Sequence, residues 1–192
     1  TCQTVLIHVA DAGAALREMA RVLRPGGLLL VAEPDNLAGN LTHLNSAGLD
    51  RETILELLEF QLHVQAGKAA LGEGDDSVGA TLPVHLRGAG LEEVRCFTND
   101  CCMTLVPPYE TGAMKLMLSQ EGGWWRENIG LWGTRNVARR FFDGAGGSEA
   151  QFERGWAATL RFLRAIEASI ADQSYAGTRG FVMVLAGAMK PN

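Results

Sequence analysis

The sequence lacks the features that mark membrane, nucleic-acid-binding or disordered chains. Its 192 residues contain no apolar run near the roughly 20 residues of a membrane span, and no basic stretch followed by an apolar one at the N-terminus. Lys and Arg number 17 against 22 Asp and Glu, a net charge of −5, which gives no electrostatic reason for a nucleic-acid partner. With 47% hydrophobic and 20% charged residues, we expect a cytoplasmic globular protein with neither membrane nor nucleic acid as partner.

Metal-ligating residues are also sparse. The four cysteines show no CxxC spacing, and no two of the four histidines have an HxxxH or HExxH relation. The sequence therefore predicts no metal site, and free buried thiols are the expected state. The adjacent pair Cys101-Cys102 leaves open a site for a soft metal or arsenite.

The most informative stretch runs from Asp11 to Pro34. Asp11 is a good N-cap for a helix with apolar residues at helical spacing, which Pro25-Gly26-Gly27 then ends. Leu28 to Ala32 is a continuous apolar run, typical of a parallel strand buried on both faces. A capped helix, a sharp turn and a buried strand make one half of a βαβ crossover, so we expect an α/β fold.

The same stretch resembles a known family. Thr1 to Val9, the pattern LxExxRVLRPGG from Leu16 to Gly27, and the strand ending in Glu33-Pro34 are similar to class I S-adenosylmethionine (SAM)-dependent methyltransferases of the type 11/25 kind. The resemblance covers the end of the fourth strand through the fifth strand of that Rossmann-like fold. It implies SAM as the cofactor and transfer of its methyl group to a small-molecule acceptor.

The glycine-rich SAM motif of this family has no counterpart here. Family members begin with a strand and a GxGxG-like turn that holds the cofactor, followed by an acidic residue that binds the ribose. No strand–GxGxxG–helix unit occurs in the sequence, and Gly72-x-Gly74-x-x-x-x-Gly79 reads as a surface loop. The resemblance therefore implies the C-terminal part of the fold, with strands in the order 5-7-6. We expect the chain to be inactive without an N-terminal SAM-binding half.

The whole chain is expected to form a single partial methyltransferase domain. Residues 1–35 should run from the end of strand 4 to strand 5, residues 36–50 should form a polar lid loop, and residues 51–103 should hold helices and strand 6, with the first helix broken by Gly67. Residues 104–147 are expected to form a helical insertion before the last strand, with helices near 109–120 and 134–143. Residues 148–192 should form a long helix opened by a Ser148/Gln151 capping box, followed by the antiparallel last strand at 181–188.

Candidate site residues follow from the expectation that ligands bind beyond the carboxyl ends of strands. The resemblance assigns three residues to the cofactor edge, chiefly through backbone groups: Cys2, Gln3 and His8. Six others are candidates for the substrate side: Glu33, Asn36, His43, Tyr109, Trp124 and Trp125. No general base is identifiable; Glu33, His8, His43 and Tyr109 are the candidates if the acceptor needs deprotonation. Core packing of His8, a solvated 36–50 loop and tryptophans that anchor the insertion are the structural alternatives.

Two other functions stay open. One alternative is a folded remnant or dimerising module that binds no SAM. The other is an unrelated α/β ligand-binding domain.

In the expected strand order, the fifth strand would leave an apolar edge unpaired, and such an edge is a template for pairing with another chain. This edge predicts a homo-oligomer.

Overall fold

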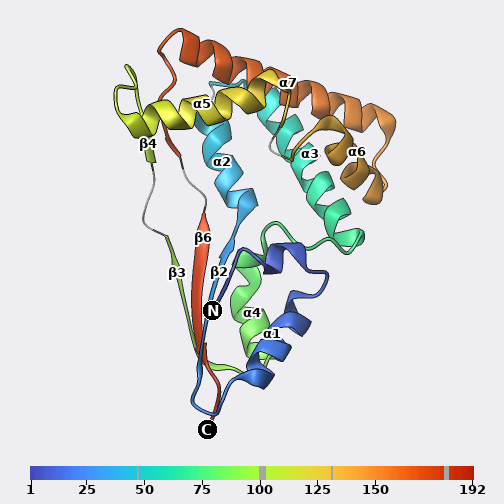
Figure 1. Ribbon diagram of the computed structural model, residues 1–192. Coiled ribbons are helices and arrows are strands. Elements are labelled where there is room, and N and C mark those ends of the chain that lie inside the picture. Colours follow the sequence, from blue (N-terminus) through green and yellow to red (C-terminus); the bar gives the residue numbers. More distant parts are fainter. Residues whose placement is uncertain (47, 100–102, 131, 180–181) are drawn as a thin grey trace. The chain divides into compact units, whose positions relative to one another are not determined.

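The computed structural model describes residues 1–46, 48–99, 103–130, 132–179 and 182–192 (Figure 1). The chain forms two compact units, whereas the sequence analysis treated it as one partial domain. We name them the sheet unit, Thr1–Gly39 with Gly72–Cys101 and Phe181–Asn192, and the helical unit, Asn40–Leu71 with Cys102–Gly180.

The sheet unit is built on four strands in the order β1-β2-β6-β3. These strands are β1 (Cys2–Gln3), β2 (Leu28–Pro34), β3 (Glu92–Thr98) and β6 (Met183–Met189). β1 is parallel to β2, and β6 is antiparallel to both of its neighbours, β2 and β3. The order β2-β6-β3 confirms the 5-7-6 arrangement and the antiparallel last strand that the resemblance implied. The α/β fold class is confirmed with it.

Helices pack on one face of this sheet. The short 3-10 turn η1 (Leu6–His8) leads into α1 (Ala12–Val22), and α4 (Val78–Gly88) contacts β2, β3 and β6 (Figure 1). The predicted cap of α1 is confirmed, because the Asp11 carboxylate accepts a 2.7 Å hydrogen bond from the Ala14 N–H. The buried core between helices and sheet is Cys2, Leu6, Ile7, Leu16, Ala20, Leu29, Val31, Val78, Leu82, Leu86, Leu91, Ala186 and Ala188.

The segment after β2 is a helix, so the prediction of a lid loop over residues 36–50 is wrong for most of its length. α2 spans Asn36–Ser46. Asp35 acts as its N-cap, since the carboxylate accepts from the Ala38 N–H at 3.2 Å. The N–H groups of Asn36 and Leu37 donate to Asp76 O and Ser77 Oγ, at 3.0 and 3.1 Å. These acceptors lie about 40 residues away in the sequence, so the local composition did not reveal them.

The helical unit contains α3 (Arg51–Ala70), α5 (Gly112–Arg126), α6 (Arg135–Gly144) and α7 (Glu149–Ala171), with a small antiparallel pair, β4 (Met103–Leu105) and β5 (Gly177–Arg179). The helical insertion before the last strand and the Ser148/Gln151 capping box are confirmed. The β4–β5 pair was not predicted, because three-residue strands show no periodic pattern. Two buried clusters hold the unit together, one around Phe162 and Ile166 and one around Phe60 and Phe152.

Gly67 does not break α3, contrary to prediction. The helix continues through it to Ala70. A Cβ on Gly67 would lie 1.6 Å from the Phe141 carbonyl oxygen in α6, closer than any real contact. The glycine therefore lets the two helix backbones approach each other, at the expense of intrinsic helix propensity.

None of the described helices is both long and apolar enough to cross a membrane.

Candidate functional site

The carboxyl ends of the parallel strands β1 and β2 form the candidate site in the sheet unit. Ligands of open α/β sheets bind beyond such strand ends. Gln3 ends β1, and the next N–H, of Thr4, donates to Ala32 O at 2.9 Å. Thr4 has a φ of 51°, a left-handed conformation that costs a residue with a Cβ about 1–2 kcal/mol. Together with the Thr4–Ala32 hydrogen bond, this conformation turns the chain sharply at the end of β1.

Glu33 lies beside the turn, but its carboxylate is occupied within the protein. The side chain is 0% exposed. Its Oε1 accepts from the Val5 and Leu6 N–H groups at 2.9 and 3.0 Å, and its Oε2 accepts from the Ile7 N–H at 3.3 Å. These are the N–H groups that the start of η1 leaves without intrahelical acceptors. This burial and these bonds argue against the predicted substrate or general-base role and assign Glu33 to holding the turn.

Cys2 is buried next to Glu33. Its Sγ donates a 3.6 Å hydrogen bond to Glu33 Oε1. Burial, followed by the negative charge of Glu33 and this hydrogen bond, raises the pKa of the Cys2 thiol. Because the thiolate is the nucleophilic form, the Cys2 side chain is not prepared for attack. Cys2 pairs with Val31 of β2 in the parallel ladder, so both its side chain and its place in the sheet serve the packing of β1.

Gln3 and His8 are both exposed at this turn. Gln3 is the last residue of β1, and His8 is the last residue of η1. The structure therefore exposes two of the three predicted cofactor residues on one short segment at the carboxyl end of β1. A primary amide and an imidazole there can donate and accept hydrogen bonds. Their role in holding a cofactor stays a prediction.

Residues 72–77 form a loop that packs beside the turn, a contact that the sequence analysis missed. Gly74 is buried, and a Cβ there would lie 2.1 Å from the Ile7 carbonyl oxygen. A Cβ on Gly79 would lie 2.7 Å from the Glu33 carbonyl oxygen. Both glycines thus let the loop and the start of α4 pack on η1 and β2, so they do not form a cradle for a ligand. The glycine spacing was the only available signal, and we interpreted it as a surface loop.

Asn36 lies at the carboxyl end of β2, where α2 begins. It is half-buried, and its N–H donates to Asp76 O. This hydrogen bond joins it to the loop formed by residues 72–77. Contact between its side chain and a substrate stays a prediction.

The other predicted substrate residues belong to the helical unit. Tyr109 is buried there, and its hydroxyl donates to the Tyr175 carbonyl oxygen at 2.8 Å. Burial raises the pKa of Tyr109, and the hydrogen bond opposes this rise. Such a hydroxyl packs the unit and is a poor base at neutral pH. The side chains of His43, Trp124 and Trp125 lie outside the described residues.

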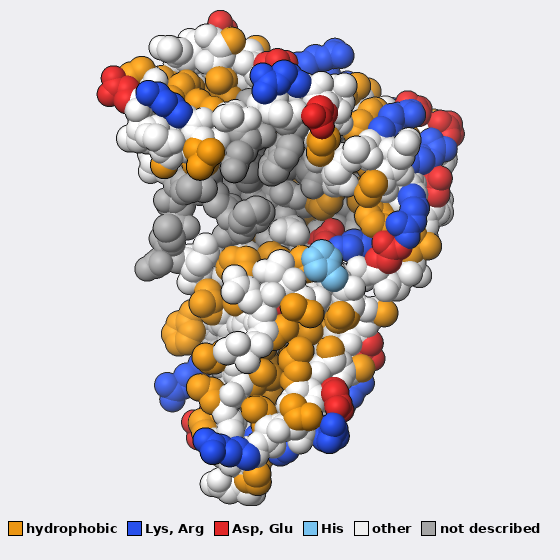
Figure 2. All heavy atoms as spheres, in the orientation of Figure 1, with side chains coloured by type: hydrophobic (Ala, Val, Ile, Leu, Met, Phe, Trp, Pro, Cys, Tyr) orange, Lys and Arg blue, Asp and Glu red, His pale blue; other side chains and the backbone are white. Residues whose placement is uncertain are grey.

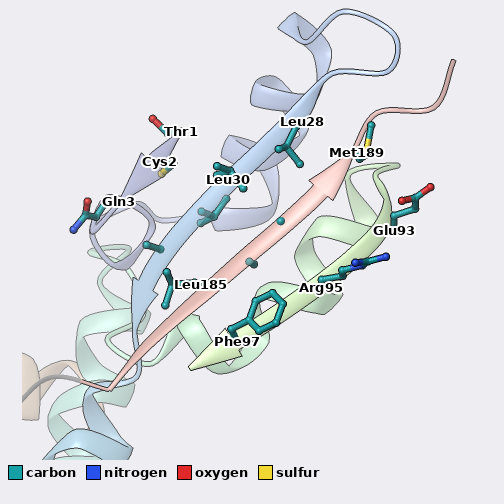
Figure 3. Close-up of a pocket in the computed structure, with 14 residues that line it drawn as sticks. Thr1, Cys2, Gln3, Leu28, Leu30, Glu93, Arg95, Phe97, Leu185 and Met189 are labelled. Atoms are coloured by element: carbon teal, nitrogen blue, oxygen red, sulfur yellow. The ribbon is translucent and has the colours of Figure 1, made fainter. Parts of the chain in front are cut away.

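A shallow apolar groove of about 630 Å³ lies on the face of the sheet opposite α1 and α4 (Figure 3). Figure 3 shows side chains of β2, β3 and β6 projecting from the strands, among them Leu30, Leu185 and Phe97. Thr1 to Gln3 line one end of the groove, so two of the predicted cofactor residues border it. A site for a small ligand encloses most of the ligand and directs several polar groups at it. This groove is open and mostly aliphatic, as a packing surface would be.

The described part of the chain contains no group of three or more His, Cys, Asp or Glu side chains able to hold a metal ion. Cys101 and Cys102 lie outside the described residues, so the alternative of a soft-metal site at this pair stays untested.

Residues 1–31 match a family model described as a methyltransferase domain. The match confirms the resemblance noted for this stretch, which includes β1, η1, α1 and the start of β2. A search of curated proteins found no matching relative.

Matches among solved structures include one methyltransferase and one protein assigned to the methyltransferases. One is the Haemonchus contortus phosphoethanolamine N-methyltransferase 2, in complex with phosphomonomethylethanolamine and S-adenosylhomocysteine, at 12% identity and a TM-score of 0.36. The match covers 99% of this chain and 32% of the Haemonchus enzyme. The other is a protein of Bacillus halodurans assigned to the methyltransferases, at 14% identity and a TM-score of 0.38, covering 100% of this chain and 68% of that one. At these scores neither likeness bears on substrate or mechanism.

Proposed function

We propose, on the premise that residues 1–31 carry a methyltransferase-domain sequence, that this chain contributes one wall of a SAM-dependent methyltransferase site. The reaction would transfer the methyl group of SAM to a small-molecule acceptor. The observation that carries the proposal is the coincidence of this sequence match with the turn at the carboxyl end of β1, where Gln3, the strained Thr4 and His8 are exposed together.

The described residues fit only part of a SAM site. Exposed hydrogen-bonding groups of Gln3 and His8 suit an edge of the cofactor. Among the described residues no glycine-rich turn opens a helix at a strand end, and protein backbone fills the space beside Gly74 and Gly79. When bound, SAM supplies an activated methyl group, and the protein's task in such a transfer is to align acceptor, methyl and leaving group.

Within this proposal, the chain's own residues act by positioning. Glu33 fixes the N–H groups of residues 5–7 and thereby the turn that displays Gln3 and His8. Of the predicted general-base candidates, Glu33 and Tyr109 have their polar groups bonded within the protein, and the side chain of His43 lies outside the described residues. His8 is therefore the remaining candidate proton acceptor.

Isothermal titration of the chain with S-adenosylhomocysteine tests the proposal without needing an acceptor. Because the described residues supply only one wall of the site, we expect weak binding that weakens further in His8→Ala, since His8 lies on the exposed turn. His63→Ala is the matched control, since His63 lies in α3 of the helical unit and stacks on Phe142. No heat up to millimolar ligand would refute binding by this chain and favour the alternative of a non-catalytic module.

That alternative has its own support. The groove on the sheet is a packing surface by its composition, and the described chain offers no glycine turn for a cofactor. A folded module that works by association needs neither feature.

A further inference from the structure

The loop that precedes α4 packs against the backbone of the turn at the end of β1. We call residues 72–77 the brace loop. Gly74 at its centre is buried with a φ of 99°, and a Cβ there would lie 2.1 Å from the Ile7 carbonyl oxygen and 2.9 Å from the His8 Cα. Only glycine accepts both this conformation and this close approach. The brace loop therefore fixes the backbone from which the exposed His8 side chain projects.

The same loop also holds the start of α2. The Asn36 N–H donates to the Asp76 carbonyl oxygen at 3.0 Å, and the Leu37 N–H donates to Ser77 Oγ at 3.1 Å. These N–H groups belong to the first turn of the helix, which leaves them without acceptors of its own. The brace loop thus sets the position of Asn36 as well as that of His8.

Hydrogen bonds within the brace loop keep it compact. The Asp75 carboxylate accepts from the Ser77 N–H at 2.9 Å, and the Asp75 carbonyl oxygen accepts from the Val78 N–H at 3.2 Å. The two outer contacts, at positions 74 and 76, are separated by at most about 7 Å of chain. A displacement of the turn is therefore transmitted to the start of α2 through a short, internally bonded segment.

We propose that the brace loop is a positioning element of the methyltransferase site, which holds the turn with His8 and the start of α2 with Asn36 at a fixed separation. This rests on the proposed function, because that function gives His8 a place at the cofactor edge and Asn36 a place on the substrate side. Gly74 and Ser77 are the positioning residues. They act on the site through the backbone of other residues and need not touch a ligand.

The separation matters because methyl transfer needs the acceptor, the methyl group and the leaving group in line. A misplacement of about 1 Å can cost about 100-fold in rate. Figure 2 shows mainly hydrophobic and uncharged side chains on one face of the sheet unit. Where few charged groups are available, a ligand depends on the placement of uncharged hydrogen-bonding groups, and the brace loop sets the placement of His8 and Asn36.

Gly74→Ala tests the contact with the turn, and Gly72→Ala is its matched control. The two glycines have φ values of 99° and 72°, so alanine is strained at either position. For a Cβ on Gly72, however, the nearest described atom is the Ala10 Cβ at 3.7 Å. We expect Gly74→Ala to weaken binding of S-adenosylhomocysteine severalfold relative to Gly72→Ala, in a titration followed by the NMR signals of the His8 imidazole. Far-UV circular dichroism shows whether each variant is folded.

Ser77→Ala tests the coupling from the other end of the brace loop, because it removes the acceptor of the Leu37 N–H. Hydrogen–deuterium exchange of peptides that cover residues 1–10 and 34–40 reads both ends without a ligand. Exchange should rise severalfold at residues 5–8 in Ser77→Ala and at residues 36–38 in Gly74→Ala. Ser77→Thr keeps the hydroxyl and should restore the wild-type rates. Variants that each loosen only their own end would refute the coupling.

The proposed function and the role of the brace loop fail in different ways. A wild-type chain that binds no S-adenosylhomocysteine refutes the proposed function, and with it any role of the brace loop in methyl transfer. A wild-type chain that binds, with equal affinities for Gly74→Ala and Gly72→Ala or with no exchange coupling, overturns the role of the brace loop alone.

Discussion

Removal of the Glu33 carboxylate should destabilise the sheet unit strongly. In Glu33→Ala the N–H groups of Val5, Leu6 and Ile7 lose their acceptor. Val5 is exposed, so water can replace the carboxylate there, whereas Leu6 and Ile7 are buried. Each buried N–H left unpaired costs about 1–3 kcal/mol.

Two such groups would cost about 2–6 kcal/mol in the free energy of unfolding. The loss of a buried charge offsets part of this, because the charge itself is costly to desolvate. We therefore expect a net loss of about 2–4 kcal/mol, a large share of the roughly 5–15 kcal/mol that stabilises a typical domain. Glu33→Gln keeps one acceptor oxygen but directs an NH₂ group at N–H donors, so its loss should be smaller and still measurable.

Urea unfolding followed by far-UV circular dichroism measures this loss. All four tryptophans belong to the helical unit, so their fluorescence follows that unit separately. Hydrogen–deuterium exchange of a peptide that covers residues 1–10 should show faster exchange at residues 5–7 in Glu33→Ala. Glu92→Ala, an exposed acid at the start of β3, is the matched control. A Glu33→Ala variant with control-like stability and unchanged exchange would refute the structural role of Glu33.

Two further predictions test other parts of the fold. Gly67→Ala should destabilise the helical unit by about 1–3 kcal/mol or more, since the new Cβ would overlap the Phe141 backbone. The control Gly88→Ala, at a position with open space around it, should be neutral or slightly stabilising. Equal effects of the two variants in urea unfolding would contradict the close approach of α3 and α6. At mildly alkaline pH, iodoacetamide should modify the exposed Cys96 much faster than the buried Cys2, as read by peptide mass spectrometry. Similar modification rates for the two thiols would contradict the burial of Cys2. Burial and Glu33 raise the pKa of the Cys2 thiol in the folded state. The contribution of the neutral thiol to stability is therefore complete below the pKa of the unfolded thiol and is lost as the pH rises through the folded pKa.

The sequence by itself determined the elements with local signals. The Asp11 cap, the Pro25-Gly26-Gly27 turn, the apolar strand that follows and the Ser148/Gln151 capping box all depend on residues within a few positions of one another. The exposed turn at the end of β1 followed from the same local reading combined with the family resemblance. These features were predictable because caps, turns and periodicity act over one or two helical turns.

Tertiary structure alone decided the parts that depend on distant partners. Glu33 appeared as a free acid in the sequence, yet its acceptor positions are filled by groups 26 to 31 residues away. Gly67 appeared as a helix breaker until α6 was seen to pack on it, and residues 36–46 appeared as a loop until Asp76 and Ser77 were seen to supply acceptors for the first turn. In each case the free energy comes from a contact between segments that chain folding brings together, and local sequence periodicity carries no information about such a contact.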